Sequence, residues 1–141
     1  MATVYLGLGG NVGDTKVYFA EALEKLKKIG TVEKISSLYK TEPVGFKDQA
    51  WFVNCAVLLE TDVSPQELLS EVKKIEKELG RTPSVKNGPR EIDIDILLYD
   101  DIVLETDMLT IPHPRMHKRA FVLIPLSEIA PNALHPRLKK R

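Results

Sequence analysis

Residues 51–79 read WFVNCAVLLETDVSPQELLSEVKKIEKEL, and this stretch decides the fold class. Its first part, from Trp51 to Thr61, is a strongly apolar run of strand length. The segment Ser64-Pro65-Gln66-Glu67 is a capping box with proline in the first turn, so it opens a helix that Gly80 closes. Apolar residues recur along that helix at Leu68, Val72, Ile75 and Leu79. The stretch therefore predicts a strand followed directly by an amphipathic helix.

A similar strand–helix pattern precedes this stretch, and a further strand follows it. Asp14 can cap the upstream helix, and Gly30 ends it. The expected elements are a strand over 3–8, a helix over 15–29, a strand over 32–41, the strand over 51–61, the helix from residue 65 and a strand over 92–99. This β-α-β-β-α-β order predicts a ferredoxin-like core, an antiparallel sheet with both helices on one face. We therefore expect an α+β fold within a single domain over residues 1–141.

The residues after 99 are expected to extend this core. Asp100-Asp101 predicts a turn into a short hairpin with residues 102–105. A segment interrupted by Pro112 and Pro114 follows, and a last apolar strand is expected over 121–124. We expect these additions to cover the free face of the sheet.

Composition argues against several classes of protein. The 141 residues are 43% hydrophobic and 28% charged, the balance of an ordinary globular domain. Twenty basic and twenty acidic residues cancel, which disfavours a polycation built to bind nucleic acid. No apolar run approaches the roughly 20 residues that span a bilayer, and the N-terminus carries no basic signal region. The single cysteine, Cys55, has no partner for an internal disulfide, which favours a cytoplasmic location.

The clearest chemical signal is the segment Arg90-Glu91-Ile92-Asp93-Ile94-Asp95-Ile96. Residues two apart in a strand point to the same face, so Asp93 and Asp95 project together while the isoleucines anchor the other side. Mg²⁺ typically takes one or two protein carboxylates together with substrate phosphates. A surface strand whose outer face merely happens to be acidic explains the pair equally well on its own.

Basic residues on both sides of the pair shift the balance toward a phosphate ligand. The preceding loop holds Arg81, Lys86 and Arg90 and has almost nothing to bury, so we expect an exposed, mobile segment over 81–91 that orders around a polyphosphate. A second basic group lies downstream over 115–119. Basic loop residues are most often simply solvated, but these two groups flank the aspartates and favour a shared anion site.

Phe52 and Asn54 share one face of the apolar strand, and an aromatic ring beside an amide suits recognition of a flat heterocycle. Core packing is the plainer explanation of Phe52, whereas a buried amide needs hydrogen-bond partners. Other motifs are missing. The chain has no P-loop, and its glycine-rich turn carries Val12 where a dinucleotide fingerprint needs glycine. A zinc pair of His113 and His117 is disfavoured because Pro114 interrupts the helix they would share.

Taken together, these motifs resemble the 6-hydroxymethyl-7,8-dihydropterin pyrophosphokinase family of folate biosynthesis, over nearly the whole chain. The motifs are LGGNVGD (8–14), YKTEPVG (39–45), FVN (52–54), IEKELGR (75–81), GPREIDIDIL (88–97) and IPHPRM (111–116) followed by RAFVL (119–123). The resemblance implies that a three-layer α-β-α sandwich is built on the ferredoxin-like core. It also implies transfer of diphosphate from ATP to the pterin hydroxymethyl group, with release of AMP.

The resemblance implies roles for individual residues. Asp93 and Asp95 match the carboxylates that hold two Mg²⁺ ions. The pterin-binding positions are Thr41, Pro43, Val44, Gly45, Phe52, Asn54 and Phe121, with the two phenylalanines sandwiching the ring. The ATP-binding positions are Glu76, Arg81, Lys86, Arg90, Ile96, Thr110, His113 and Arg119. The residues expected to be catalytic are Arg90, Asp95, His113 and Arg119.

The chain departs from the family at Asn87, where many members carry tryptophan, and at Lys73, where some carry glutamine. Two other functions stay open on the residues alone. A palm-like nucleotidyl transferase or nuclease also places two aspartates on an antiparallel sheet, although zero net charge argues against it. A non-catalytic ferredoxin-like binding module predicts no magnesium-dependent turnover. We expect ATP and the pterin as small-molecule partners, with no nucleic acid, membrane or obligate protein partner.

Overall fold

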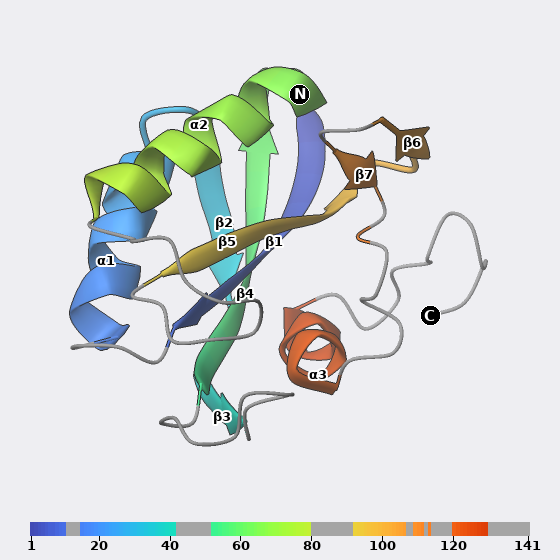
Figure 1. Cartoon of the computed structure of the whole chain (residues 1–141). Coiled ribbons are helices and arrows are strands. Elements are labelled where there is room, and N and C mark those ends of the chain that lie inside the picture. Colours follow the sequence, from blue (N-terminus) through green and yellow to red (C-terminus); the bar gives the residue numbers. More distant parts are fainter. Residues whose placement is uncertain are drawn as a thin grey trace.

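Strand β1 (Ala2–Gly10) lies in the middle of a five-stranded antiparallel sheet (Figure 1). It pairs with β4 (Phe52–Thr61) on one side and with β5 (Asp93–Tyr99) on the other. The sheet order is β2-β4-β1-β5, and both β2 (Thr31–Ile35) and β3 (Tyr39–Thr41) pair with β4. This computed structural model describes residues 1–10, 15–41, 52–79, 92–106, 109–111, 113 and 120–129.

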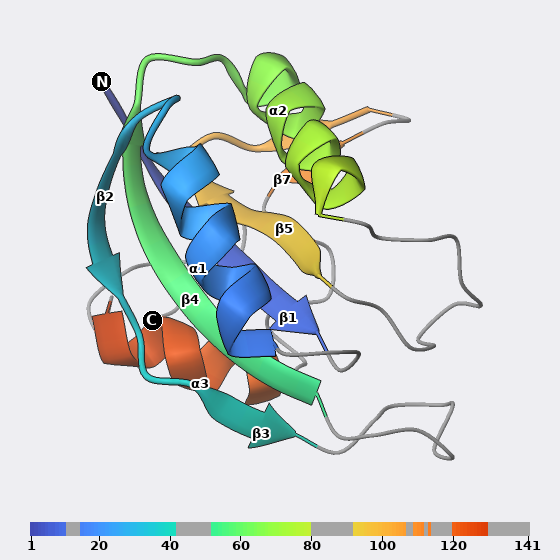
Figure 2. The ribbon, with the colours of Figure 1, turned by 90° about the vertical axis from the view of Figure 1, so that its left-hand side faces the viewer.

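The strand order and the placement of the helices confirm the expected α+β class with a ferredoxin-like core. Helices α1 (Thr15–Leu26) and α2 (Pro65–Glu78) cover one face of the sheet, and α3 (Ala120–Ile129) lies against the other (Figure 2). The three layers are therefore helices, sheet and helix.

Two apolar clusters hold the layers together, one on each face of the sheet. The cluster under α1 and α2 includes Val4, Leu6, Leu8, Phe19, Ala22, Leu26, Val57, Leu59, Leu68, Val72 and Ile75. The cluster under α3 consists of Ala56, Leu58, Leu97, Leu98, Leu126 and Ile129. Because β4 and β5 contribute to both clusters, each contains a run of consecutive apolar residues, over 55–59 and 96–99, where an ordinary half-buried strand would alternate.

Helix α2 begins as the capping box predicts. Ser64 is the N-cap, and its Oγ accepts a hydrogen bond of 3.2 Å from the backbone N–H of Glu67. The same hydroxyl donates to Oε1 of Glu67 at 3.2 Å, and Pro65 occupies the first turn, where its missing N–H costs nothing. Four residues of the helix are buried: Leu68, Val72, Ile75 and Glu76.

Helix α1 ends at Leu26 rather than at residue 29, because the chain tightens into turns there. The backbone N–H of Lys28 donates to Lys25 at 3.1 Å, and that of Ile29 donates to Leu26 at 3.0 Å. Gly30 follows where the chain passes close to β4. A Cβ at this position would lie 2.3 Å from the carbonyl oxygen of Glu60, so only glycine fits.

The strand expected over 32–41 is divided in two. Between β2 and β3, Ser36 takes part in the ladder through its side chain, since its Oγ accepts a hydrogen bond of 2.8 Å from the backbone N–H of Ala56. Its own N–H donates to the carbonyl of Ala56, also at 2.8 Å. The serine hydroxyl therefore replaces a backbone acceptor and shifts the register from Ile35 opposite Val57 to Tyr39 opposite Asn54.

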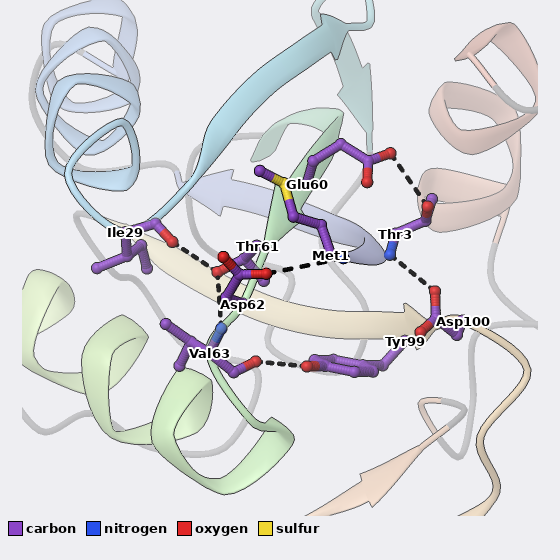
Figure 3. Close-up of polar contacts among 9 residues, drawn as sticks. All are labelled: Met1, Thr3, Ile29, Glu60, Thr61, Asp62, Val63, Tyr99 and Asp100. Atoms are coloured by element: carbon purple, nitrogen blue, oxygen red, sulfur yellow. Dashed lines mark hydrogen bonds and ion pairs between the residues drawn. The ribbon is translucent and has the colours of Figure 1, made fainter.

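The hairpin expected between 92–99 and 102–105 is wrong. After β5, Asp100 has φ 51°, and its N–H donates to the carbonyl of Thr3 at 2.8 Å. Its carboxylate accepts from the N–H of Thr3 at 2.7 Å, which ties the turn to the start of β1 (Figure 3). Instead, β6 (Leu104–Glu105) pairs with β7 (Thr110–Ile111), because Thr106 and Leu109 exchange hydrogen bonds that close that loop.

The strand expected over 121–124 is also wrong, because these residues lie in helix α3. A short apolar run does not distinguish a strand from a buried helix by periodicity. The distinguishing signal is downstream, where Leu126 and Ile129 recur at a spacing of three and pack on the sheet. None of the described helices has the length and apolar character that a membrane crossing requires.

Candidate active site

Two rows of residues cross the sheet on the face that α3 partly covers. In the first row, Gly9 of β1 lies opposite Asn54 of β4 and opposite Asp93 of β5. In the second row, Gly7 lies opposite Ala56 and Asp95. Residues directly opposite each other in a sheet point to the same face. Asn54 and the two aspartates therefore share one face, and the glycines of β1 leave bare backbone between them.

The predicted shared face of the aspartates is observed. Ile92, Ile94 and Ile96 are buried under the helices, whereas Asp93 and Asp95 are half-buried on the other face. A Cβ at Gly9 would lie 2.8 Å from Oδ1 of Asn54, so a side chain there would displace the amide.

A bulge in β5 ends this open surface. The β1–β5 register shifts between Tyr5 and Leu6, which leaves Leu97 as an extra residue. As a result Leu97 and Leu98 both join the cluster under α3, and Tyr99 returns to the helix-covered core. The strand thus presents carboxylates at its beginning and an apolar anchor for α3 at its end.

His113 lies at the outer edge of β5. Its backbone N–H donates to the carbonyl of Leu97 at 3.0 Å, and its Nε2 lies 3.8 Å from Oδ1 of Asp95. The prediction from the resemblance placed both residues in one site, and the structure brings them together although they are far apart along the chain.

Glu76 reaches the same edge from α2. The residue is 2% exposed, and its Oε2 accepts a hydrogen bond of 2.7 Å from the backbone N–H of Ile94, between the two aspartates. Its Oε1 lies 3.5 Å from Nζ of Lys73. Sequence reasoning missed this contact, although a signal was present. Glu76 occupies a position in the buried stripe, four residues after Val72 and three before Leu79.

The remaining described positions near β5 are Ile96 and Thr110. Ile96 is 4% exposed with its side chain in the core, so contact with a ligand would use its backbone. Thr110 lies half-buried on β7, opposite Glu105. Helix α2, strand β7 and His113 therefore all lie along the outer edge of β5.

Comparison with known proteins gives this geometry its context. The family model described as 7,8-dihydro-6-hydroxymethylpterin-pyrophosphokinase matches residues 5–131. The chain belongs to the 6-hydroxymethyl-7,8-dihydropterin pyrophosphokinase family. It is 52% identical over 140 residues to the 2-amino-4-hydroxy-6-hydroxymethyldihydropteridine pyrophosphokinase of Aquifex aeolicus, covering 99% of this chain and 88% of that protein. It is 50% identical over 127 residues to the Bacillus subtilis pyrophosphokinase of the same name, covering 89% and 76%.

Solved structures agree with this pyrophosphokinase fold. The HPPK-DHPS triple mutant of Plasmodium falciparum superposes with a TM-score of 0.76 at 18% identity, over 99% of this chain and 41% of that longer chain. Membership of the pyrophosphokinase family sets aside the nucleic-acid enzyme and the non-catalytic module considered from the sequence.

Several expected pyrophosphokinase site residues lie outside the described part of the chain. They are Pro43, Val44, Gly45, Arg81, Lys86, Arg90 and Arg119, together with the expected mobile segment over 81–91. For Thr41, Phe52 and Phe121 the structure describes the backbone. Thr41 lies opposite Phe52 at the ends of β3 and β4, and Phe121 is the second residue of α3.

The described donors fit a magnesium site better than a zinc site. Within the described ranges no group of three or more His, Cys, Asp or Glu side chains is arranged to hold a metal. Mg²⁺ does not need such a cage, because it takes one or two carboxylates and fills its other positions with water and substrate phosphates. Asp93 and Asp95, half-buried on one face opposite the glycines of β1, are the described residues that would supply such partial coordination.

Proposed function

We propose that this pyrophosphokinase carries out its reaction on the face shared by Asn54, Asp93 and Asp95. The reaction of the family is the transfer of diphosphate from ATP to the hydroxymethyl group of 6-hydroxymethyl-7,8-dihydropterin in folate synthesis. The observation that carries the assignment is the row Asn54–Gly9–Asp93. It sets an amide suited to a heterocycle and a carboxylate suited to a metal on either side of a half-buried glycine.

The pterin end of the site is formed by β3, β4 and α3. Asn54 is 7% exposed, so its amide has few places to satisfy its hydrogen-bonding groups except neighbouring protein and a bound ring. It hydrogen-bonds the edge of the pterin together with the backbone of residues 41–45. Phe52 and Phe121 stack on the two faces of the ring.

The ATP end follows the outer edge of β5. Thr110 and His113 contact the nucleotide from this edge, Ile96 does so through its backbone, and the buried Glu76 supports the edge through the N–H of Ile94. Arg81, Lys86, Arg90 and Arg119 bind the phosphates. Arginine suits this role because its guanidinium chelates two phosphate oxygens at once.

Asp93 and Asp95 hold the magnesium that accompanies ATP, and we propose two ions. When bound, they supply neutralisation of charge on the phosphate oxygens. Asp95 also lies near His113, with Nε2 3.8 Å from Oδ1, so the carboxylate and the imidazole can act on the same phosphates.

The transfer itself needs positioning rather than a protein nucleophile. The pterin hydroxyl oxygen bonds to the β-phosphorus of ATP, while the bond from that phosphorus to the oxygen shared with the α-phosphate breaks. AMP leaves with the electron pair of that bond, the hydroxyl proton passes to water, and the pterin diphosphate remains. Arg90, His113 and Arg119 stabilise the charge that shifts between these oxygens.

The test supplies the purified chain with ATP, Mg²⁺ and 6-hydroxymethyl-7,8-dihydropterin and identifies the nucleotide product. AMP together with a pterin diphosphate supports the proposal, whereas ADP indicates an ordinary kinase and overturns it. A cytoplasmic location, a single domain over 1–141 and the lack of an obligate protein partner stay predictions.

A further inference from the structure

Glu128 joins helix α3 to the strand beside Asn54. Its Oε2 accepts hydrogen bonds from the backbone N–H of Ser37 at 2.8 Å and from the Ser37 hydroxyl at 3.2 Å. Its Oε1 accepts a third hydrogen bond, of 2.5 Å, from the hydroxyl of Tyr39. One carboxylate therefore binds three donors from a segment about ninety residues away in sequence. Figure 2 shows that segment, between β2 and β3, running beside α3.

This contact differs from an ordinary surface carboxylate, since three donors of this chain hold both of its oxygens. The hydroxyl of Tyr39 and the N–H of Ser37 lower the pKa of Glu128 below its usual range. The same hydrogen bond raises the pKa of Tyr39. Near neutral pH the carboxylate is charged and the phenol is protonated, which are the states that the bond requires.

The opposite side of the same segment is fixed to β4. Ser36 is buried, its Oγ accepts from the N–H of Ala56 at 2.8 Å, and the same hydroxyl donates to the carbonyl of Ser37 at 2.8 Å. Residues 36 and 37 are thus bonded on one side to the sheet and on the other to α3. Since β3 has only three residues, each paired with β4, these contacts on the preceding segment add to what holds it in place.

Both tied elements lead to the expected pterin positions. Tyr39 lies directly opposite Asn54, and β3 ends two residues later at Thr41, opposite Phe52. On the other side, helix α3, which carries Glu128, begins at Ala120, next to Phe121. The hydrogen bonds of Glu128 therefore connect β3, which leads to the residues expected to bind the pterin edge, to α3, which carries the expected stacking residue Phe121.

We propose that Glu128 is a positioning residue for the pterin end of the site, acting through Tyr39 and Ser37 to fix β3 against α3. The inference rests on the proposed function, because it assigns the pterin to Asn54 and Phe121. Glu128 itself touches neither substrate. Its removal should disturb the pterin end, while the ATP end at the outer edge of β5 keeps its own contacts.

The test compares Glu128→Ala and Tyr39→Phe with Glu21→Ala, which removes an exposed glutamate from α1 on the other face. Calorimetry measures the affinity of each protein for the pterin and, separately, for a non-hydrolysable ATP analogue with Mg²⁺. We expect pterin affinity to fall roughly three- to tenfold in Glu128→Ala, which loses all three hydrogen bonds, and less in Tyr39→Phe, which loses one. ATP affinity and the Glu21→Ala protein should change little.

Hydrogen exchange supplies a readout that does not depend on the substrate. Amides 39–41 should lose protection in Glu128→Ala, while amides of β1 and β5 keep it. Lost protection with normal pterin affinity, or equal losses for both ligands, would overturn the positioning role. Tyr39→Phe keeps the Ser37 bonds and so answers the question if Glu128→Ala does not fold. A wild-type protein that fails to bind the pterin would overturn the proposed function itself.

Discussion

The backbone N–H of Ile94 donates a hydrogen bond of 2.7 Å to Oε2 of Glu76. Ile94 lies between Asp93 and Asp95, on an edge strand of the described sheet. An edge strand has no neighbour to hold its outer N–H groups, and here a buried carboxylate from α2 takes that place. The bond fixes the strand at the residue where the two aspartates must be held side by side.

Removing this carboxylate should destabilise the protein. We expect Glu76→Ala to lower the free energy of unfolding by about 1–3 kcal/mol, because the N–H of Ile94 loses its partner in a buried setting. Urea denaturation measures the change. Lys73→Ala is the control, since it removes a side chain that is 57% exposed and leaves the hydrogen bond from Ile94 to Oε2 in place, so its effect should be smaller. If Glu76→Ala is as stable as Lys73→Ala, the hydrogen bond to Ile94 does not contribute to the stability of the protein.

The aspartates themselves should matter for catalysis and not for stability. Asp93→Asn and Asp95→Asn keep the size of a half-buried side chain, so the melting temperature should stay close to that of the wild type. Turnover should fall by on the order of 100-fold or more, because the amide cannot neutralise and hold the metal. Assays over a range of Mg²⁺ concentration measure this loss. Asp101→Asn, in the exposed turn after β5, is the matched control, and near-normal activity of both active-site variants would refute the metal assignment.

Gly9 and Gly7, the glycines of β1 in the two rows, offer a matched pair of substitutions. In Gly9→Ala the new Cβ would lie 2.8 Å from Oδ1 of Asn54, whereas in Gly7→Ala it would lie 3.4 Å from Cδ1 of Leu97, an ordinary contact. We expect Gly9→Ala to weaken pterin binding by about 1–3 kcal/mol, the usual cost of overpacking, and Gly7→Ala to weaken it less. Titration with the pterin distinguishes them. The reverse order would mean that Asn54 does not recognise the ring.

We expect the thiol of Cys55 to be unreactive in the folded protein. It is buried in β4, and burial raises the pKa of its thiol to about 12. Since the thiolate is the reactive form, a thiol reagent at pH 8 should label the native protein far more slowly than the urea-unfolded protein. Labelling at equal rates in both states would contradict the burial of this strand.

The local parts of the site were predictable from the sequence. The common face of Asp93 and Asp95 follows from strand alternation, and the start of α2 follows from the capping box, because both depend on neighbouring residues. The long-range parts were not. Nothing near His113 indicates that its backbone bonds to Leu97, since that contact depends on where β7 returns. The link from Glu128 to Tyr39 likewise arises only after α3 packs on the sheet.

The two errors in the predicted elements also have long-range causes. The run over 121–124 is apolar and short, which suits a strand or a buried helix equally, and tertiary packing under Leu126 and Ile129 decides for the helix. The expected hairpin after Tyr99 fails because Asp100 bonds back to Thr3 instead of directing the chain along β5. In both places the deciding partner lies elsewhere in the chain.

The bulge at Leu97 changes which residues of β5 face each side of the sheet. Before it, odd-numbered residues point toward α3, and after it the numbering of the faces is reversed. Deleting Leu97 would join Ile96 to Leu98 opposite Leu6 and Tyr5, so the strand would alternate regularly and the two aspartates would stay opposite Gly9 and Gly7. The deletion would remove only one of the two consecutive leucines that pack under α3. The extra residue therefore serves the attachment of α3, and the placement of the carboxylates does not depend on it.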